Sequence, residues 1–189
     1  DDSRKVSEGC LFICVKGGSF DGHSVAEQML EKGAYAVIAE RDLGLGDRQI
    51  IVPNSREAYG RLCAAWFDHP EKKMRFIGVT GTNGKTTTKE LIAAVLAEKY
   101  NVLYTQGNLN NHIGVPKTLL QLTAEHDIAV IEMGANHPGE IKTLVDIVEP
   151  DCGLITNVGR AHLGGFGSFE GVVRTKGELY DYLRNNSAT

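Results

Sequence analysis

Apolar residues in the first third of the chain occur in short runs that alternate with a longer amphipathic stretch. The short runs cover residues 11–15, 35–39 and 49–52, and residues 24–32 carry apolar side chains at helical spacing. Short runs are typical of strands, whereas the wider spacing is typical of helices. Asn54 and Ser55 can cap a further helix that ends near Phe67. This alternation predicts a small α/β unit.

A second set of strands and helices follows a polar break. Residues 68–73 contain a proline and interrupt the apolar pattern, so we predict an interdomain linker there. The strands predicted behind it cover residues 75–79, 101–105, 128–133 and 153–156. Helices are expected to start near Lys85, Pro116 and Pro138. This order predicts a mostly parallel sheet flanked by helices on both faces, and two domains, residues 1–73 and 74–189.

Composition and charge narrow the class of protein. Of the 189 residues, 42% are hydrophobic, which is sufficient for a folded core, and the formal net charge is −4. The charges are interspersed, so we expect no nucleic acid partner and no attraction to an anionic membrane. No apolar run approaches the roughly 18 residues of a membrane helix, and no signal-peptide pattern opens the chain.

The cysteines predict the cellular compartment of the protein, and the first residues predict how much of it the chain covers. Cys10, Cys14, Cys63 and Cys152 form no CxxC pair and lie mostly in apolar stretches, which is typical of reduced thiols. We therefore expect a cytoplasmic protein, and we expect it to be monomeric. The chain opens with DDSR and without a starting Met, so we expect a fragment of a longer protein.

The strongest chemical signal is the segment GTNGKT, residues 81–86, between a predicted buried strand and a predicted helix. Amides at a helix N-terminus favour a bound phosphate, and Gly81 and Gly84 permit conformations closed to other residues. Lys85 supplies positive charge to the β- and γ-phosphates of a nucleotide, and Thr86 can ligate Mg²⁺. The strict pattern GxxxxGK[ST] fails, since its first glycine would fall at Val79. The order of strand, loop and helix nevertheless favours an ATP site over an ordinary glycine-rich turn.

Glu132 stands near the end of another apolar strand pattern, where a nucleotide-binding sheet presents residues at its carboxyl edge. It could hold Mg²⁺ directly or through water. An exposed acid is the more common finding at such a position, but the phosphate loop upstream favours the metal role. The residues predicted to bind ATP are Gly81, Thr82, Asn83, Gly84, Lys85, Thr86 and Thr87.

Four motifs in order extend this interpretation: TGTNGKTTT at 80–88, GNLNNHIGVP at 107–116, EMGANHPGEI at 132–141 and TNVGRAHL at 156–163. Together they resemble the Mur ligase family, the ATP-dependent amide-forming enzymes of peptidoglycan precursor synthesis. Segments within residues 2–23 resemble the N-terminal domain of that family, which receives the UDP end of a UDP-MurNAc-peptide. The resemblance therefore implies that Ser3 and Arg4 belong to the substrate-binding part of the protein.

The resemblance also assigns roles to residues that spacing alone leaves unremarkable. Lys85, Glu132, His162 and Lys176 form the implied catalytic set. Thr86, Glu132 and His162 match positions that bind Mg²⁺ in the family. Lys176, by itself an ordinary helix-surface charge, matches a lysine that is carbamylated in several of these ligases and then ligates a second Mg²⁺.

The two halves of the chain resemble different branches of the family. The asparagine-rich segment and EMGANHPGEI resemble members that add D-alanyl-D-alanine. The N-terminal block resembles members that add the third residue of the peptide at least as much, and a hybrid of the two stays open. Asn108, Asn110 and Asn111 either position the UDP-sugar or peptide or form loop hydrogen bonds, and the two interpretations have equal weight.

The implied reaction starts with attack of the carboxylate of the UDP-linked peptide on the γ-phosphate of ATP. The resulting acyl phosphate is then attacked by D-Ala-D-Ala, or by an amino acid in the other branch. Family members continue into a C-terminal domain that helps to close the site, so we expect the isolated chain not to turn over. Three alternatives stay open: a related ligase such as folylpolyglutamate synthase, an unrelated P-loop kinase or GTPase, and a non-catalytic nucleotide-binding module.

Overall fold

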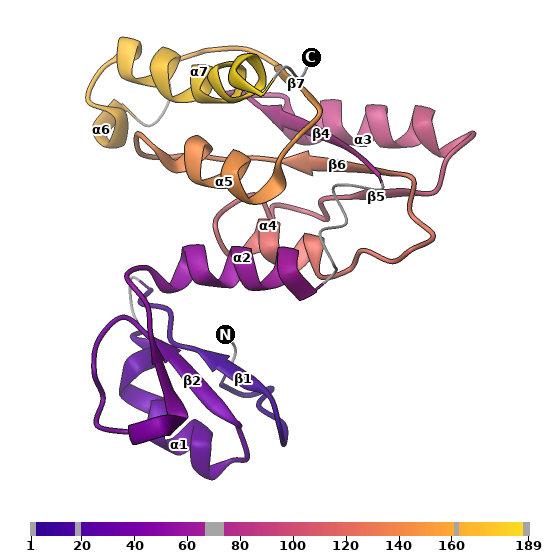
Figure 1. Cartoon of the computed structure of the whole chain (residues 1–189). Helices are drawn as coiled ribbons and strands as arrows, with labels where there is room; N and C mark the ends of the chain where they lie inside the picture. Colours follow the sequence, from indigo (N-terminus) through magenta and orange to yellow (C-terminus); the bar gives the residue numbers. More distant parts are fainter. Residues whose placement is uncertain (1–2, 18–19, 67–73, 161–162, 187–189) are drawn as a thin grey trace. The chain divides into compact units, whose positions relative to one another are not determined.

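The structure, a computed structural model of the chain, describes residues 3–17, 20–66, 74–160 and 163–186 (Figure 1). The chain divides into two compact units, Asp1–Tyr59 and Gly60–Thr189, and the division falls inside helix α2 (Ser55–Trp66). The predicted linker at residues 68–73 lies outside the described residues, so the predicted domain boundary there stays a prediction.

The N-terminal unit is built on a three-stranded parallel sheet. Its strands are β1 (Leu11–Ile13), β2 (Ala36–Ala39) and β3 (Gln49–Ile51), in the order β1-β2-β3. Its helical segments before α2 are η1 (Gly22–Val25), α1 (Ala26–Glu31) and η2 (Gly46–Arg48). The helix predicted at 24–32 begins earlier, as a 3-10 turn, because the Asp21 carboxylate caps it by accepting a hydrogen bond from the His23 amide at 3.0 Å.

The C-terminal unit is built on a four-stranded sheet in which every strand pair is parallel. Its strands are β4 (Arg75–Thr80), β5 (Val102–Tyr104), β6 (Ile128–Glu132) and β7 (Cys152–Ile155), in the order β5-β6-β4-β7. Its helices are α3 (Lys85–Ala97), α4 (Gly114–Leu119), α5 (Glu140–Val148), α6 (Leu163–Phe166) and α7 (Phe169–Asn185). The predicted α/β fold class is therefore confirmed, with α4 starting two residues before Pro116 and α5 two residues after Pro138.

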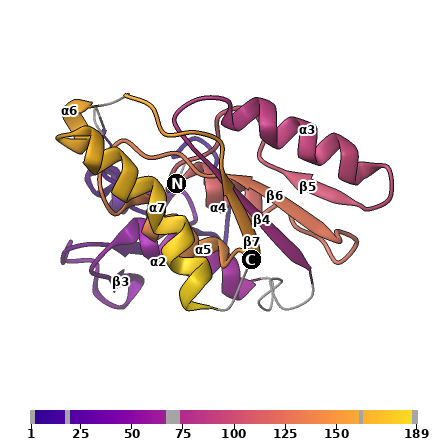
Figure 2. The same ribbon diagram turned by 90° about the horizontal axis from the view of Figure 1, so that it is seen from above.

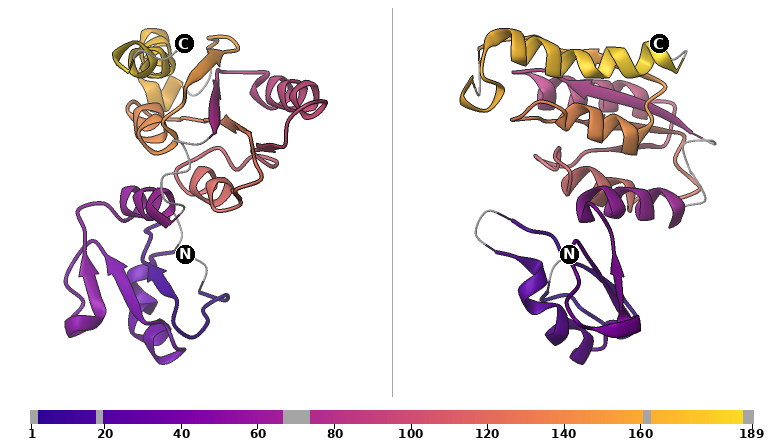
Figure 3. Two further views of the ribbon diagram at one scale, coloured as in Figure 1. Left: turned by 45° about the vertical axis from the view of Figure 1, so that its right-hand side comes forward. Right: turned by 60° about the vertical axis from the view of Figure 1, so that its left-hand side comes forward.

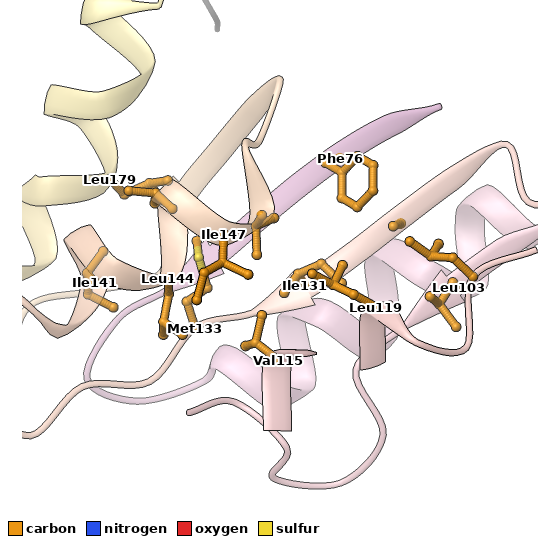
Figure 4. Close-up of a cluster of buried hydrophobic side chains, with 14 of the residues drawn as sticks. Phe76, Leu103, Val115, Leu119, Ile131, Met133, Ile141, Leu144, Ile147 and Leu179 are labelled. Atoms are coloured by element: carbon orange, nitrogen blue, oxygen red, sulfur yellow. The ribbon is translucent and has the colours of Figure 1, made fainter. Parts of the chain in front are cut away.

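Apolar side chains alternate between the two faces of this sheet, and different helices cover each face. Phe76 and Ile131 lie in a buried cluster with residues of α4, α5 and α7, drawn in Figure 4. Val79 and Val130 point the other way and pack with Ile92 of α3. This is the period-two alternation of a strand that is buried on both faces. Figures 2 and 3 show the sheet between α3 on one side and the pair α5 and α7 on the other.

Three cysteines in the described part of the chain, Cys10, Cys14 and Cys152, are free thiols. Burial, with the nearby Asp21 carboxylate, raises the pKa of the Cys14 thiol to about 11, so it stays protonated and unreactive near neutral pH. Over the described part of the chain, we find no helix with the length and apolarity that crossing a bilayer requires.

Candidate functional site

The carboxyl ends of the four parallel strands in the C-terminal unit meet at one edge of the sheet. Ladder pairing places Val79 opposite Glu132 and Thr80 opposite Ile155, so β4, β6 and β7 end side by side. This edge is where open α/β sheets bind their ligands. The predicted phosphate loop follows β4, and Glu132 is the last residue of β6.

The loop between β4 and α3 adopts a conformation that depends on its glycines. Gly81 has φ +142° and Gly84 has φ +76°, both in regions that residues with a side chain rarely adopt. Gly84 directly precedes α3, whose thirteen residues start at Lys85. The first amides of a helix have no acceptor within the helix and carry a partial positive charge. The turn at Gly84 therefore presents amides that can bind an anion.

The segment after β7 supports this loop, a role that sequence reasoning missed. The Thr156 hydroxyl donates to the Asn83 carbonyl at 2.6 Å, and the Asn157 side-chain amide donates to the same carbonyl at 3.0 Å. The Asn157 side-chain oxygen accepts from the Asn83 amide at 3.1 Å, and its carbonyl accepts from the Thr82 amide at 3.0 Å. The Thr82 hydroxyl accepts from the Gly159 amide at 2.9 Å. The sequence signal was the position of TN at the end of a predicted strand.

Lys85 lies over the phosphate loop. Its ammonium donates to the Gly81 carbonyl at 2.9 Å and to the Thr82 carbonyl at 3.1 Å. These contacts hold a positive charge at the loop and at the start of α3. The position suits a lysine that binds the outer phosphates of a nucleotide.

Thr86 and Glu132, which are 46 residues apart in the chain, are joined by a hydrogen bond. The Thr86 hydroxyl donates to Glu132 Oε2 at 3.0 Å. Glu132 is only 1% exposed, so the alternative of a solvated acid at a strand end is wrong. The contacts that the described residues make with this carboxylate come from neutral donors, Thr86 and the side-chain amide of Asn110 at 2.7 Å. A buried carboxylate of this kind is stabilised by a cation.

The Thr86–Glu132 pair fits Mg²⁺. This ion prefers oxygen ligands, and a hydroxyl oxygen 3.0 Å from a carboxylate oxygen allows both to ligate one ion. No group of three or more His, Cys, Asp or Glu side chains with metal-ligand geometry occurs among the residues that the structure describes. His162, the third predicted ligand, lies outside those residues, and its metal role stays a prediction.

Lys176 lies in the middle of α7 and is almost fully buried, at 3% exposure, so its interpretation as an ordinary helix-surface charge is wrong. Its ammonium lies 5.7 Å from the centroid of the Phe166 ring. Burial and, secondly, the like charge of Lys85 lower the pKa of Lys176 to about 8. A lysine with such a pKa is partly neutral, and therefore nucleophilic, near neutral pH.

Hydrogen bonds connect the part of α7 around Lys176 to the segment between β6 and α5. Two residues further along α7, the Glu178 carboxylate accepts hydrogen bonds from the amides of Gly139 at 2.9 Å and Lys142 at 2.8 Å, at the start of α5. The Glu140 carboxylate accepts from the amides of Asn136 and His137. Much of the EMGANHPGEI motif thus shapes the loop between Glu132 and α5.

The predicted substrate-binding asparagines make loop hydrogen bonds. Asn110 donates to Glu132 Oε1, and its carbonyl accepts from the Gly134 amide at 2.7 Å. Asn111 Oδ1 accepts from the amides of Ile113 and Gly114, just where α4 begins. The Asn108 carbonyl accepts from the Asn110 amide at 2.8 Å. These contacts show the structural role, and a substrate role for the asparagines stays a prediction.

Ser3 and Arg4 belong to the N-terminal unit, whereas the candidate residues of the ATP site belong to the C-terminal unit. Ser3 is half-buried and Arg4 is exposed. Their predicted contact with the UDP part of a substrate stays a prediction.

Two further residues at the site carried no sequence signal. Thr105, which follows β5, accepts a hydrogen bond from the Glu132 amide through its hydroxyl at 2.9 Å. Lys89, one turn into α3, is completely buried and donates to the Thr105 carbonyl at 2.6 Å. Sequence reasoning treats a lysine in the middle of a helix as a surface residue, so only the fold identifies this one.

A parallel sheet whose strand ends carry a phosphate loop and a buried acid is the architecture of P-loop-type nucleotide-binding domains. Comparison with known proteins makes this class specific. Residues 79–189 match the Mur ligase middle domain, and residues 2–67 match a domain described as the Mur ligase family catalytic domain. The chain therefore belongs to the Mur ligase family.

Individual relatives match nearly the whole chain but are longer. The UDP-N-acetylmuramoyl-tripeptide--D-alanyl-D-alanine ligase of Escherichia coli (strain K12) is 48% identical over 185 residues, which is 98% of this chain and 40% of the relative. A crystal structure of MurF from Acinetobacter baumannii is similar with a TM-score of 0.85 and 41% identity, covering 96% of this chain and 40% of that one. MurF from Thermotoga maritima in complex with ADP is similar with a TM-score of 0.84 and 39% identity, covering 96% and 42%. The chain thus spans about two-fifths of the length of these relatives.

Proposed function

We propose that this chain supplies the substrate-binding and ATP-binding parts of an ATP-dependent ligase of peptidoglycan precursor synthesis. The ligase activates the carboxylate of a UDP-MurNAc-tripeptide as an acyl phosphate, and D-Ala-D-Ala then attacks it. The amide forms as phosphate leaves. The proposed acceptor and donor are those in the name of the relative that is 48% identical over nearly all of this chain.

One observation carries the ATP part of this proposal. Lys85, Thr86 and Glu132 come from the start of α3 and the end of β6, and they meet at the carboxyl edge of the sheet. A related protein of known structure is described as a complex with ADP, which supports a nucleotide at this edge. The loop conformation, the lysine and the buried acid are the three parts that phosphate binding with a divalent cation requires.

In the proposed reaction the protein mainly positions charge. The amides at the start of α3 and the Lys85 ammonium bind the outer phosphates and stabilise the charge that develops on the transferred phosphoryl group. Thr86 and Glu132 would hold Mg²⁺, which supplies further positive charge to the phosphates when bound. Lys176, in carbamylated form, would present a carboxylate-like end for a second Mg²⁺, and His162 is proposed as a further ligand.

The alternative branch, which adds the third residue to a UDP-MurNAc-dipeptide, receives less support. The resemblance of the N-terminal block was its main argument. The relative named for D-Ala-D-Ala addition matches 98% of the chain, that block included. We further propose that the protein is cytoplasmic and monomeric.

Ligand-dependent thermal unfolding tests the proposal. ATP with Mg²⁺ at about 100 times its Kd is expected to stabilise the chain by about 2.7 kcal/mol, because a ligand stabilises the state that it binds. UDP-MurNAc-tripeptide is expected to stabilise it as well, and GTP is expected to do so much less. The matched variant is Glu132→Gln, which keeps size and hydrogen-bonding capacity but removes the charge that would bind Mg²⁺. It should retain ATP binding in EDTA and lose the added effect of Mg²⁺.

Each arm of this experiment has an outcome that contradicts a part of the proposal. A preference for GTP would exclude the ligase and favour an unrelated P-loop protein. Indifference to UDP and UDP-MurNAc-tripeptide, with ATP bound, would favour a nucleotide-binding module of another kind. An undiminished Mg²⁺ effect in Glu132→Gln would remove Glu132 from the metal site.

Carbamylation of Lys176 is expected to depend on pH. Only the neutral amine reacts with CO₂, and the lowered pKa of about 8 makes that form available close to neutral pH. With ¹³C-labelled CO₂ held at constant concentration, the NMR carbamate signal should increase with pH through the region of pH 8. Lys176→Met is the control and should lack the signal. A signal that survives in this variant, or no signal in the parent chain, would contradict the assignment.

A further inference from the structure

Lys89 is a buried lysine whose charge has no role in the proposed reaction. It lies in α3, and its side chain is 0% exposed. Its ammonium donates to the Thr105 carbonyl at 2.6 Å, pairs with the half-exposed Glu90 carboxylate at 2.7 Å and lies 5.4 Å from the centroid of the Tyr104 ring. Burying a charged group is costly unless it is paired and hydrogen-bonded, and these contacts satisfy that requirement.

The contacts of Lys89 lead to the candidate metal ligand. Thr105 accepts from Lys89 through its carbonyl and from the Glu132 amide through its hydroxyl, at 2.9 Å. Glu132 in turn accepts from the hydroxyl of Thr86, which precedes Lys89 by three residues on α3. Three hydrogen bonds therefore connect Lys89, Thr105, Glu132 and Thr86 in series, and the series starts and ends on one turn of α3.

This series of hydrogen bonds fixes the position of a backbone group, which apolar packing would not do. Replacement of a buried ion pair by apolar residues of similar volume is often neutral or stabilising, and the Glu90 partner is half-exposed, so packing between α3 and β5 does not by itself require a lysine. A lysine at this place instead fixes the Thr105 carbonyl at a defined point. The Thr105 hydroxyl is thereby held where it binds the backbone of Glu132. The orientation of the Glu132 carboxylate follows from the position of its backbone and from its bond to Thr86.

We infer that Lys89 is a positioning residue for the cation site formed by Thr86 and Glu132. It acts through Thr105 and does not itself touch the nucleotide or the cation. The inference rests on the proposed function, because it presupposes that Thr86 and Glu132 bind Mg²⁺ together with ATP. Residues that orient metal ligands commonly change metal affinity or activity about 10- to 100-fold when they are replaced.

The test compares the Kd of ATP in Mg²⁺ with its Kd in EDTA for the whole chain, by calorimetric titration. The ratio of the two values is the gain due to Mg²⁺. Lys89→Met should reduce this gain about tenfold and leave the Kd in EDTA unchanged. Lys99→Met is the matched control, because Lys99 lies just beyond the same helix, is exposed and has a similar contact with a ring, at 5.3 Å from the Tyr100 centroid.

A second readout needs neither nucleotide nor metal. Amide hydrogen exchange of Glu132 should become about fivefold faster or more in Lys89→Met, because a hydrogen bond to its amide is weakened. The amide of Met133 donates to the Val79 carbonyl on the neighbouring strand and provides the internal reference. Its exchange should stay unchanged.

A pair of substitutions at Thr105 makes the test independent of whether Lys89→Met folds. Thr105→Val removes the hydroxyl that binds the Glu132 amide and should lower the Mg²⁺ gain, whereas Thr105→Ser keeps the hydroxyl and should restore it. An unchanged gain in both Lys89→Met and Thr105→Val would overturn the inference and leave the proposed function standing. Loss of stability in Lys89→Met with an unchanged gain in Thr105→Val would show a purely structural lysine. If the parent chain itself gains nothing from Mg²⁺, the proposed cation site fails first, and the inference falls with it.

Discussion

Replacement of Lys85 by Met is expected to raise the Kd of ATP about 10- to 100-fold. Its ammonium is held over the phosphate loop by the carbonyls of Gly81 and Thr82, at 2.9 and 3.1 Å, and it is the charge that would meet the outer phosphates. A hydrogen bond to a charged group contributes about 1.5–3 kcal/mol, which corresponds to this range of affinity. Isothermal titration of the chain with ATP in Mg²⁺ measures the change.

The stability of the Lys85→Met variant separates loss of binding from loss of structure. Its melting temperature without ligand should stay close to that of the parent chain, because the side chain is only partly buried and its partners are two carbonyls of the loop. Lys142→Met removes an exposed lysine that pairs with Asp146, and it should leave the Kd unchanged. Equal ATP affinity in Lys85→Met and the parent chain would remove Lys85 from the phosphate site.

Replacement of Gly81 by Ala is expected to destabilise the C-terminal unit by about 3 kcal/mol. The backbone there has φ +142°, and an added Cβ would overlap with the Thr156 hydroxyl and lie 3.1 and 3.2 Å from the amide nitrogens of Thr156 and Asn157. The hydroxyl cannot turn away freely, because it donates to the Asn83 carbonyl at 2.6 Å. Backbone strain and overpacking each cost about 1–3 kcal/mol.

Gly84→Ala is the matched control for this substitution. Gly84 also has a positive φ, +76°, but an added Cβ would meet nothing within 4 Å. It should therefore cost only the strain of the backbone, about 1 kcal/mol. By calorimetry without ligand, the melting temperature should fall by about 6–12 °C for Gly81→Ala and about 2–4 °C for Gly84→Ala. Equal effects would show that the contact with the segment after β7 is unimportant.

These two predictions concern different properties of one loop. Lys85 provides charge and should affect binding, whereas Gly81 provides space and should affect folding. The difference arises because Gly81 lies against Thr156 and Asn157, while Lys85 lies over the loop. A phosphate loop can therefore lose its function in two ways that thermal unfolding and titration distinguish.

Local pattern was sufficient to predict most of the secondary structure of this chain. The strands around Phe76 and Val130 are short apolar runs, and such runs are recognisable because both faces of a parallel strand are buried. The start of α3 at Lys85 followed from the glycines before it. Boundaries shifted where a side chain bonds the backbone: Asp21 extends the first helical segment toward the N-terminus, and Asn111 binds the amides of Ile113 and Gly114, where α4 begins before Pro116.

The candidate site likewise contains residues that the sequence predicts and residues that only the fold identifies. Lys85 and Thr86 were predictable because the chemistry of a phosphate loop is contained in consecutive residues. Glu132 was predictable from its place at a strand end, although its pairing with Thr86 was not. Thr105 and Lys89 were not predictable, because a threonine after a strand and a lysine within a helix are ordinary residues in any sequence.

The sequence alone thus determined the α/β class, the phosphate loop and, through four ordered motifs, the resemblance to Mur ligases. Only the tertiary structure decided that Glu132 and Lys176 are buried, at 1% and 3% exposure, and that a completely buried Lys89 is linked to Glu132 through Thr105. The physical reason is that burial and hydrogen bonding between residues distant in the chain depend on the order of strands in the sheet. The order β5-β6-β4-β7 brings four separate strand ends to one edge, and no local pattern specifies it.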